Sequence, residues 1–98
     1  MATITWTQEA LDRLRGIHNY IAADSPRSAT SVVNGIYAKV QLLAINPYLG
    51  QRYEPVTDRE VREIIFGHYR IPYLLTDESQ IVVLGVFHGA MDIERYLQ

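Results

Sequence analysis

The sequence predicts an α+β domain: an N-terminal strand, a helical hairpin packed on a small antiparallel β-sheet meander, and a short C-terminal helical turn. Apolar residues recur at three- and four-residue steps over residues 8–45, the period of amphipathic helices. Three apolar-rich runs follow over residues 61–87, separated by short turn signals, which is typical of an antiparallel meander. With 98 residues, of which 48% are hydrophobic, the chain is expected to form one domain, residues 1–98.

The helical part is preceded by a short strand. Residues 2–6 alternate small or polar with large apolar side chains, which predicts a strand at a sheet edge. Thr7 is the expected N-cap of the first helix, and Ser25 that of the second. Pro26 then occupies the first helical position, where its missing N–H costs no hydrogen bond. The second helix is expected to end near Ile45, and two helices joined so tightly must lie antiparallel.

The sheet part is dominated by its third run. Ile81–Phe87 is apolar on both faces, which predicts a central strand with packing on each side. Such a strand places His88 at an end of the sheet. Residues 47–60 contain proline and glycine and indicate a loop, and residues 92–97 are expected to form the final helical turn.

The apolar stripes of both helices need a partner, and the meander is the large apolar surface left for them. Truncation of a buried leucine or isoleucine in that interface to alanine should lower the free energy of unfolding by about 2–5 kcal/mol. The main contacts between hairpin and sheet are expected to include Leu14, Ile17, Ile21, Val33, Ile36, Val40, Ile64, Val83 and Leu84.

Composition excludes several classes of function. The chain has no cysteine, so disulfides and thiolate metal sites are ruled out. No secretory signal is visible and no apolar run could span a bilayer, so a cytoplasmic protein without membrane contact is expected. Eight acidic side chains against five arginines over residues 50–98 disfavour tight direct binding of nucleic acid. No phosphate-binding glycine loop and no histidine pair at helical spacing is present, so no cofactor and no metal are expected.

Three histidines are candidates for chemistry. His18 lies on or beside the apolar face of the first helix, where a structural role is favoured. His68 follows Gly67 in a predicted hairpin turn and is expected to be exposed. His88 could act as a general base near neutral pH, although a role as a polar cap of the strand is favoured over catalysis.

Arg62 and Arg70 lie on neighbouring strands of the meander. The tight turn between them places Arg62 near Tyr73, so the two arginines are diagonal rather than opposite. Each could form an ion pair with Glu60 or Glu63, or could contact an anion or a partner surface. Ion pairing is somewhat favoured for Arg62, and the two interpretations are equal for Arg70.

Several segments are informative through their order and spacing. They are Ser25-Pro26 with Ala29, Asn46–Gly50, Arg62-Glu63, Tyr69–Tyr73 and Ile81–Ala90. In this order they resemble the RelE/ParE superfamily of bacterial type II toxin–antitoxin modules, and the resemblance covers nearly the whole chain. It implies a small plasmid-stabilising toxin that is neutralised by a cognate antitoxin.

The superfamily has two branches, which differ in mechanism. RelE-like members cut messenger RNA in the ribosomal A site, whereas ParE-like members have no nuclease activity and poison DNA gyrase. In the nuclease branch, Arg70 matches the arginine of a Tyr-Arg motif and Tyr96 lies near the tyrosine of the last helix. Together with His88, these residues would be the catalytic set if the chain were a nuclease.

The resemblance favours the ParE branch because of two departures from the nuclease pattern. Val61 and Glu63 stand where lysines are expected, and a carboxylate at position 63 would repel the phosphate that a lysine would hold. The arginine expected after the last strand is absent from His88–Met91. This ending looks more like ParE, although Met91 stands where that group commonly has arginine.

Three hypotheses follow. The chain is a non-enzymatic gyrase inhibitor, a ribosome-dependent endoribonuclease, or an antitoxin-binding domain that has lost toxicity. An amphipathic antitoxin segment is expected to dock by helix-in-groove packing or strand addition. Partner contacts are expected at Tyr20, Tyr37, Arg62, Arg70, Tyr73, His88 and Arg95.

Overall fold

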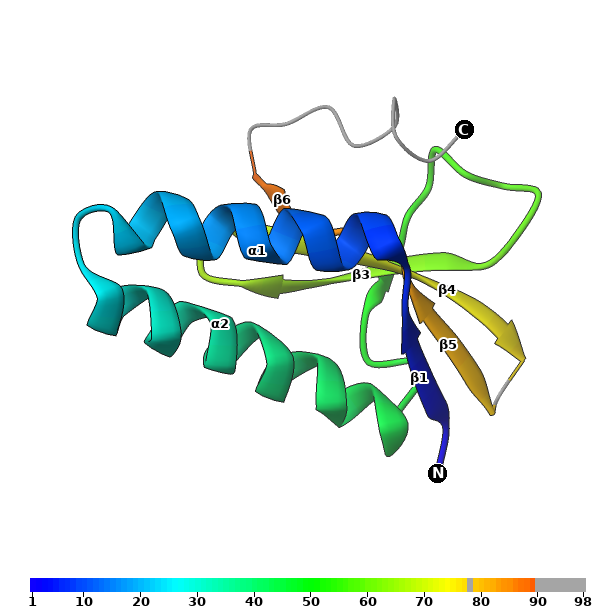
Figure 1. Ribbon diagram of the computed structural model, residues 1–98. Helices are drawn as coiled ribbons and strands as arrows, with labels where there is room; N and C mark the ends of the chain where they lie inside the picture. The colour runs from blue at the N-terminus through cyan, green and yellow to red at the C-terminus, as the bar shows by residue number, and fades with distance from the viewer. Residues whose placement is uncertain (78, 90–98) are drawn as a thin grey trace.

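The computed structural model describes residues 1–77 and 79–89, so the expected helical turn over residues 92–97 lies outside the described residues. Within them, two helices lie side by side against a six-stranded sheet, the α+β arrangement that the sequence predicts (Figure 1). No helix in this part of the chain is long and apolar enough to cross a membrane. The elements are β1 (Thr3–Trp6), α1 (Gln8–Ala22), α2 (Pro26–Gln41), the 3₁₀ helix η1 (Leu42–Ala44), β2 (Gln51–Arg52), β3 (Val61–Phe66), β4 (Tyr69–Asp77), β5 (Gln80–Val83) and β6 (Phe87–His88).

Both helices begin at the predicted caps. The Thr7 hydroxyl accepts a hydrogen bond from the Ala10 N–H at 3.0 Å, and the Ser25 hydroxyl accepts one from the Ser28 N–H at 3.2 Å. Each bond satisfies a backbone donor that the first helical turn leaves without a partner. The second helix is shorter than predicted, because α2 ends at Gln41 and the chain continues as η1.

The sheet has the strand order β1-β5-β4-β3-β2, and β6 also pairs with β4. Strands β3, β4 and β5 form the predicted antiparallel meander, and Arg62 lies opposite Tyr73, as the turn geometry predicts. The N-terminal strand β1 lies at the expected edge. It runs parallel to β5, which places Thr3 beside Gln80.

The prediction of one continuous strand over Ile81–Phe87 is wrong. The chain forms β5, leaves the sheet after Val83 and returns as β6. Pro72 of β4 explains the break. Its carbonyl accepts a hydrogen bond from the Leu84 N–H at 2.9 Å, so the N–H that proline lacks would face the same side. The ladder is therefore interrupted at Pro72, and pairing along this edge of β4 resumes only where Arg70 lies opposite Phe87.

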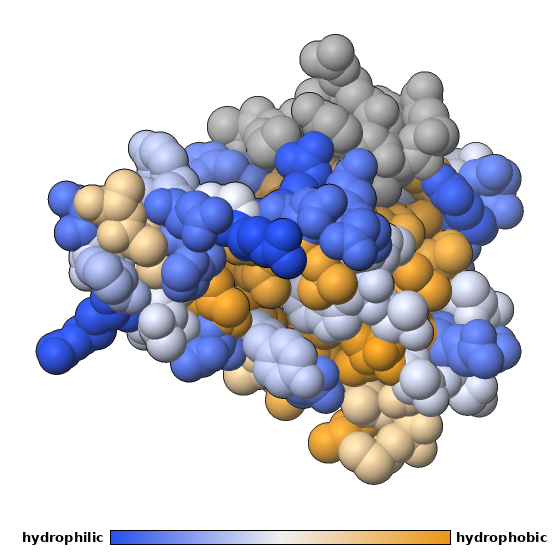
Figure 2. All heavy atoms as spheres, in the orientation of Figure 1, coloured by the Kyte–Doolittle hydropathy of each residue, from blue (hydrophilic) through white to orange (hydrophobic). Residues whose placement is uncertain are grey.

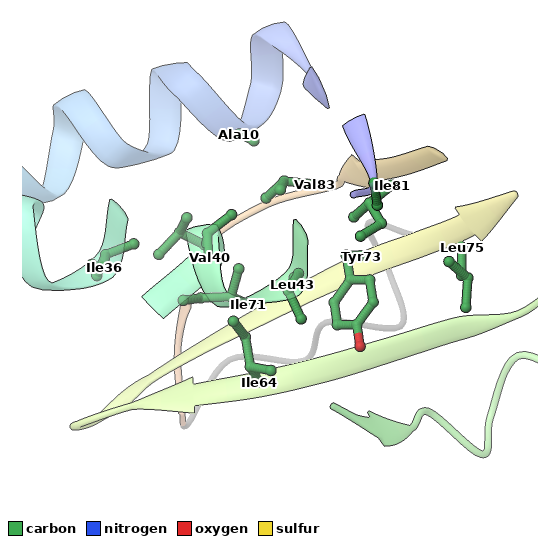
Figure 3. Packing of buried hydrophobic residues seen from close by; sticks show 12 residues of the cluster. Ala10, Ile36, Val40, Leu43, Ile64, Ile71, Tyr73, Leu75, Ile81 and Val83 are labelled. Atoms are coloured by element: carbon green, nitrogen blue, oxygen red, sulfur yellow. The ribbon is translucent and has the colours of Figure 1, made fainter. Parts of the chain in front are cut away.

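The main core lies between the helices and one face of the sheet. In Figure 3, side chains from α1, α2, η1 and strands β3–β5 converge on this space. Ile36, Val40, Ile64 and Val83 belong to it, as predicted. Leu14 and Ile17 are only partly buried and pack at its margin. Further core residues, not predicted, are Leu43, Ile71, Tyr73, Leu75 and Ile81.

A second, smaller cluster lies on the opposite face of the sheet. Tyr53, Val61 and Phe87 are buried there, and Leu84 packs against them. The prediction that Leu84 contacts the helical hairpin is therefore wrong. Side chains alternate between the faces of a strand, and the break after Val83 places Leu84 with the second cluster. The apolar character of both faces of this run is explained by the two clusters.

Candidate functional site

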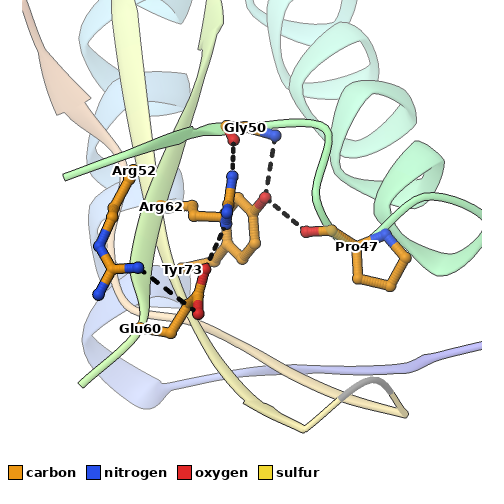
Figure 4. Close-up of polar contacts among 6 residues, drawn as sticks. All are labelled: Pro47, Gly50, Arg52, Glu60, Arg62 and Tyr73. Carbon is orange, nitrogen blue, oxygen red and sulfur yellow. Dashed lines mark hydrogen bonds and ion pairs between the residues drawn. The ribbon is translucent and has the colours of Figure 1, made fainter.

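One end of the β3–β4 hairpin is closed by a polar network (Figure 4). The Tyr73 hydroxyl donates a hydrogen bond to the Pro47 carbonyl at 2.7 Å and accepts one from the Gly50 N–H at 3.0 Å. Arg62 donates to the Gly50 carbonyl at 2.8 Å and to Glu60 at 2.7 Å. These contacts hold the loop after η1 against the sheet.

This network corrects one predicted partner contact. Tyr73 is one of the residues predicted to contact the partner, but its side chain is fully buried in the main core. Burial raises the pKa of the Tyr73 hydroxyl above the usual 10.0, while the Gly50 hydrogen bond and the charge of Arg62 act in the opposite direction. Arg62 forms the predicted ion pair with Glu60, and its guanidinium also lies over the Tyr48 ring, 5.0 Å from the centroid. Both residues therefore serve the loop's structure.

Arg70 is held by a carboxylate on the same face of the sheet. Its Nε and one terminal nitrogen donate to the two oxygens of Glu63, at 3.1 and 3.0 Å. This forked geometry is the strong form of an arginine–carboxylate contact. Of the two predicted interpretations for Arg70, the structure therefore shows the ion pair.

The other end of the β3–β4 hairpin, where its turn lies, borders a groove. A groove of about 500 Å³ lies between α1 and β6. The groove is lined by Arg13, Gly16, Ile17, Tyr20, Tyr69, Val86 and His88. On α1, the Arg13 guanidinium lies over the Phe87 ring, 4.3 Å from the centroid, in a cation–π contact. His88 is exposed at the mouth of this groove.

Arg70 and His88, the two candidate nuclease residues that the structure describes, are not brought together. Tyr69 lies opposite His88 in the β4–β6 register, and Arg70 lies opposite Phe87. Because residues directly opposite each other share a face and neighbours along a strand alternate, Arg70 and His88 lie on opposite faces of the sheet. Tyr96 and Arg95, the remaining predicted catalytic and partner residues, lie outside the described residues.

Two of the predicted partner tyrosines are exposed on the helices. The side chain of Tyr20 is 85% exposed beside the groove, and that of Tyr37 is 53% exposed on α2. Tyr37 stacks on Trp6 of β1, with ring centroids 6.3 Å apart. His18 contacts the neighbouring Asn19 side chain at 3.2 Å. Both tyrosines are therefore accessible to a partner, as a role in partner contact requires.

Apolar surface gathers around the helical hairpin. Figure 2 shows it between the two helices and near the N-terminus. Among the aliphatic side chains, Leu11 of α1 is 42% exposed, Leu42 of η1 is 48% exposed, and Ile45 just beyond η1 is 75% exposed. Contiguous exposed apolar surface marks interaction sites more often than isolated apolar side chains do.

The sequence did not reveal the groove between α1 and β6. Arg13 and Gly16 look like solvent-facing helix residues, and Tyr69 resembles any strand tyrosine. They come together only because α1 packs across the end of the sheet where β6 returns to pair with β4. A pattern within α1 or within the meander contains no signal for this long-range contact.

Comparison with known proteins identifies the class of fold. The structure is similar to a chain of the chromosomal ParDE toxin–antitoxin system from P. aeruginosa, with a TM-score of 0.74, 22% sequence identity, and coverage of 90% of this chain and 96% of that one. It is also similar to a chain of the RelBE2 toxin–antitoxin complex from Mycobacterium tuberculosis, with a TM-score of 0.58, 25% identity, and coverage of 89% and 96%. No curated protein matches the chain.

The family follows from the sequence match. Residues 4–93 match the model of the ParE toxin of the type II toxin–antitoxin system parDE. The match spans nearly the whole chain, so the protein belongs to the ParE toxin family of type II toxin–antitoxin systems. The predicted relationship to the RelE/ParE superfamily is thereby confirmed.

Proposed function

We propose that this toxin acts in the cytoplasm by inhibiting DNA gyrase and that a cognate antitoxin neutralises it. Membership of the ParE family supports a gyrase target over a ribosomal one. The observation that carries the choice is the separation of Arg70 and His88 on opposite faces of the sheet. A ribonuclease that uses these two side chains needs both at one phosphodiester.

The pairing of Arg70 strengthens this argument. Its guanidinium is occupied by both oxygens of Glu63, so a substrate phosphate would have to displace a carboxylate and would then lie beside its negative charge. Phosphodiester cleavage needs cations that stabilise the developing charge. A general base alone contributes only about 10²–10⁴-fold to a rate, which leaves such a cleavage inefficient.

The test is a pair of assays with the purified toxin. Supercoiling by purified gyrase should be inhibited, and messenger RNA on programmed ribosomes should stay intact. The variants Arg70→Ala and His88→Ala should leave messenger RNA equally intact. Codon-positioned cleavage that both variants abolish would overturn the proposal in favour of the ribonuclease.

A domain that has lost toxicity is the third outcome. It would leave both gyrase and ribosomes unaffected while still binding the antitoxin. Inhibition of gyrase by the free toxin, relieved by adding the antitoxin, distinguishes the proposed function from this outcome.

The antitoxin surface is proposed on the helical hairpin. The solved structures similar to this chain come from a ParDE system and a RelBE2 toxin–antitoxin complex, which supports an antitoxin partner. Tyr37, near the C-terminal end of α2, and Ile45, just after η1, both offer exposed apolar area. An amphipathic antitoxin segment can bury that area, and buried aromatic side chains dominate the energetics of such interfaces.

This surface is tested by co-purification with the product of the adjacent gene. Tyr37→Asp and Ile45→Asp should weaken the complex, because each places a charge in an apolar contact. Thr30→Asp, near the opposite end of α2, is the matched control and should leave binding unchanged. Equal affinity for all three variants would place the antitoxin elsewhere.

A further inference from the structure

Two of the chain's three histidines lie next to each other at the turn end of the β3–β4 hairpin. His68 lies in the turn between β3 and β4, and His88 lies in β6. Their ring centroids are 6.2 Å apart, and the ring planes differ by 24°. Both residues are exposed. Because the two positions are far apart in sequence, the fold alone brings these imidazoles together.

The backbone beneath the two rings is fixed. The Gly89 N–H donates a hydrogen bond to the His68 carbonyl at 2.7 Å, which ties β6 to the turn. Tyr69, the residue after His68, pairs directly with His88. The Tyr69 ring also packs edge-on against the His88 ring, with centroids 6.0 Å apart. The strands therefore hold the two imidazoles near each other, and only side-chain torsions remain to be set.

We propose that His68 and His88 together bind one divalent transition-metal ion of the zinc class. Neutral imidazole is a ligand that suits zinc, copper and nickel. A zinc–nitrogen bond is about 2.0–2.1 Å long. One ion therefore fits between rings whose centroids are 6.2 Å apart, once each side chain turns a nitrogen towards it. Exposed side chains change rotamers on a picosecond-to-nanosecond timescale, so this adjustment is readily made.

The site is open rather than closed. Within residues 1–77 and 79–89, no group of three or more histidine and acidic side chains is placed to hold a metal. Two imidazoles leave the other coordination positions to water or to a ligand from a bound molecule. Arg13 lines the groove beside His88, and its positive charge lowers the affinity for a cation. We therefore expect this site to bind the ion weakly and exchangeably, unlike a structural zinc site with four protein ligands.

The consequence of binding is a cross-link between the β3–β4 turn and β6. An ion that binds the folded chain and not the unfolded one stabilises the fold by mass action. This inference does not depend on the proposed gyrase target, because its test measures metal binding and stability alone. Magnesium and calcium prefer oxygen ligands and should have no effect, which distinguishes imidazole coordination from a general effect of charge.

The experiment uses the full chain without a histidine tag. Zinc is titrated by calorimetry and the melting temperature is measured with and without zinc, with magnesium as a further control. About one zinc ion should bind per chain, and the melting temperature should rise by about 4–8 °C at a few-fold excess of zinc over its dissociation constant. His68→Ala and His88→Ala should each lose the binding heat and the rise in melting temperature.

His18→Ala is the matched control, because His18 lies on α1, where its ring contacts the Asn19 side chain rather than either of the other two rings. It should retain both effects. Ring resonances of His68 and His88, and not of His18, should shift when zinc is added to the unaltered chain, which tests the proposal even if a variant fails to fold. Zinc binding that survives in both His68→Ala and His88→Ala, binding lost in His18→Ala, or no binding by the unaltered chain would overturn the proposal.

Discussion

Tyr73 and Tyr69 lie on the same strand and both contact the main core, yet they have different surroundings. Tyr73 is fully buried and its hydroxyl bonds to two backbone groups of the covering loop. Tyr69 is partly buried and lines the open groove beside His88. The segment that packs over each end of the β3–β4 hairpin therefore determines whether the tyrosine there is a core residue or lines a groove. The loop after η1 closes one end, and α1 with β6 leaves a groove at the other.

Truncation of each tyrosine to alanine should give the largest difference in stability between the two ends. Tyr73→Ala should lower the free energy of unfolding by about 3–5 kcal/mol, because it opens a cavity and removes the hydroxyl. Tyr69→Ala should cost clearly less, since part of its ring already faces the groove. Urea denaturation measures both. Equal losses would show that the two ends are equally packed.

Glycine-to-alanine substitutions distinguish the two ends of the hairpin more sharply. The substitution should destabilise the protein at Gly50 and stabilise it at Gly16. In Gly50→Ala the new Cβ would lie 2.6 Å from the Glu63 carbonyl oxygen and 2.8 Å from the Tyr73 ring and hydroxyl, so a loss of about 1–3 kcal/mol is expected. In Gly16→Ala the new Cβ meets nothing within 4 Å. That change should stabilise α1 by about 0.5–1 kcal/mol, since alanine favours helix over glycine. Thermal or urea unfolding of the pair gives both signs.

Removing only the hydroxyl tests the polar network. Tyr73→Phe leaves the Gly50 N–H and the Pro47 carbonyl without this partner, and should cost about 1 kcal/mol. Tyr69→Phe is the matched control and should change stability by less. If the two phenylalanine variants unfold at the same urea concentration, the network contributes nothing to stability.

The smallest expected effect is at alkaline pH. The pKa of the Tyr73 hydroxyl is raised by burial, so the unfolded chain releases this proton at a lower pH than the folded one. The contribution to stability is therefore complete below about pH 10 and is lost as pH rises above that value towards the folded pKa. Stability measured from pH 8 to 11 should fall more steeply for the unaltered chain than for Tyr73→Phe. Parallel curves would contradict this assignment.

The elements that depend on local sequence were predictable. Thr7 and Ser25 cap the helices as expected, because a capping hydroxyl acts within three residues. The register between β3 and β4 followed from the tight turn that joins them. The break after Val83 was not predicted, because it arises on the neighbouring strand, where Pro72 lacks a donor. The apolar run over residues 81–87 contains no signal that its neighbouring strand lacks a hydrogen-bond donor at Pro72.

The candidate site was less predictable for a related reason. Arg70 and His88 looked compatible in sequence, and only the β4–β6 register shows that they face opposite ways. Tyr73 looked like a surface tyrosine because nothing in its own strand indicates that the loop carrying Pro47 and Gly50 covers it. The meeting of His68 and His88 also depends on the return of β6 after the break. Contacts of this kind link distant segments and leave no local pattern.

The parallel pairing of β1 with β5 has a consequence for biosynthesis. Thr3 to Trp6 are synthesised well before their partners, Gln80 to Val83, which lie far along the chain. Non-local pairings of this kind slow folding, because the chain must close a long loop before the contact stabilises it. β1 can therefore join the sheet only after β5 has been synthesised. Until then β1 lacks the strand that it pairs with in the finished sheet.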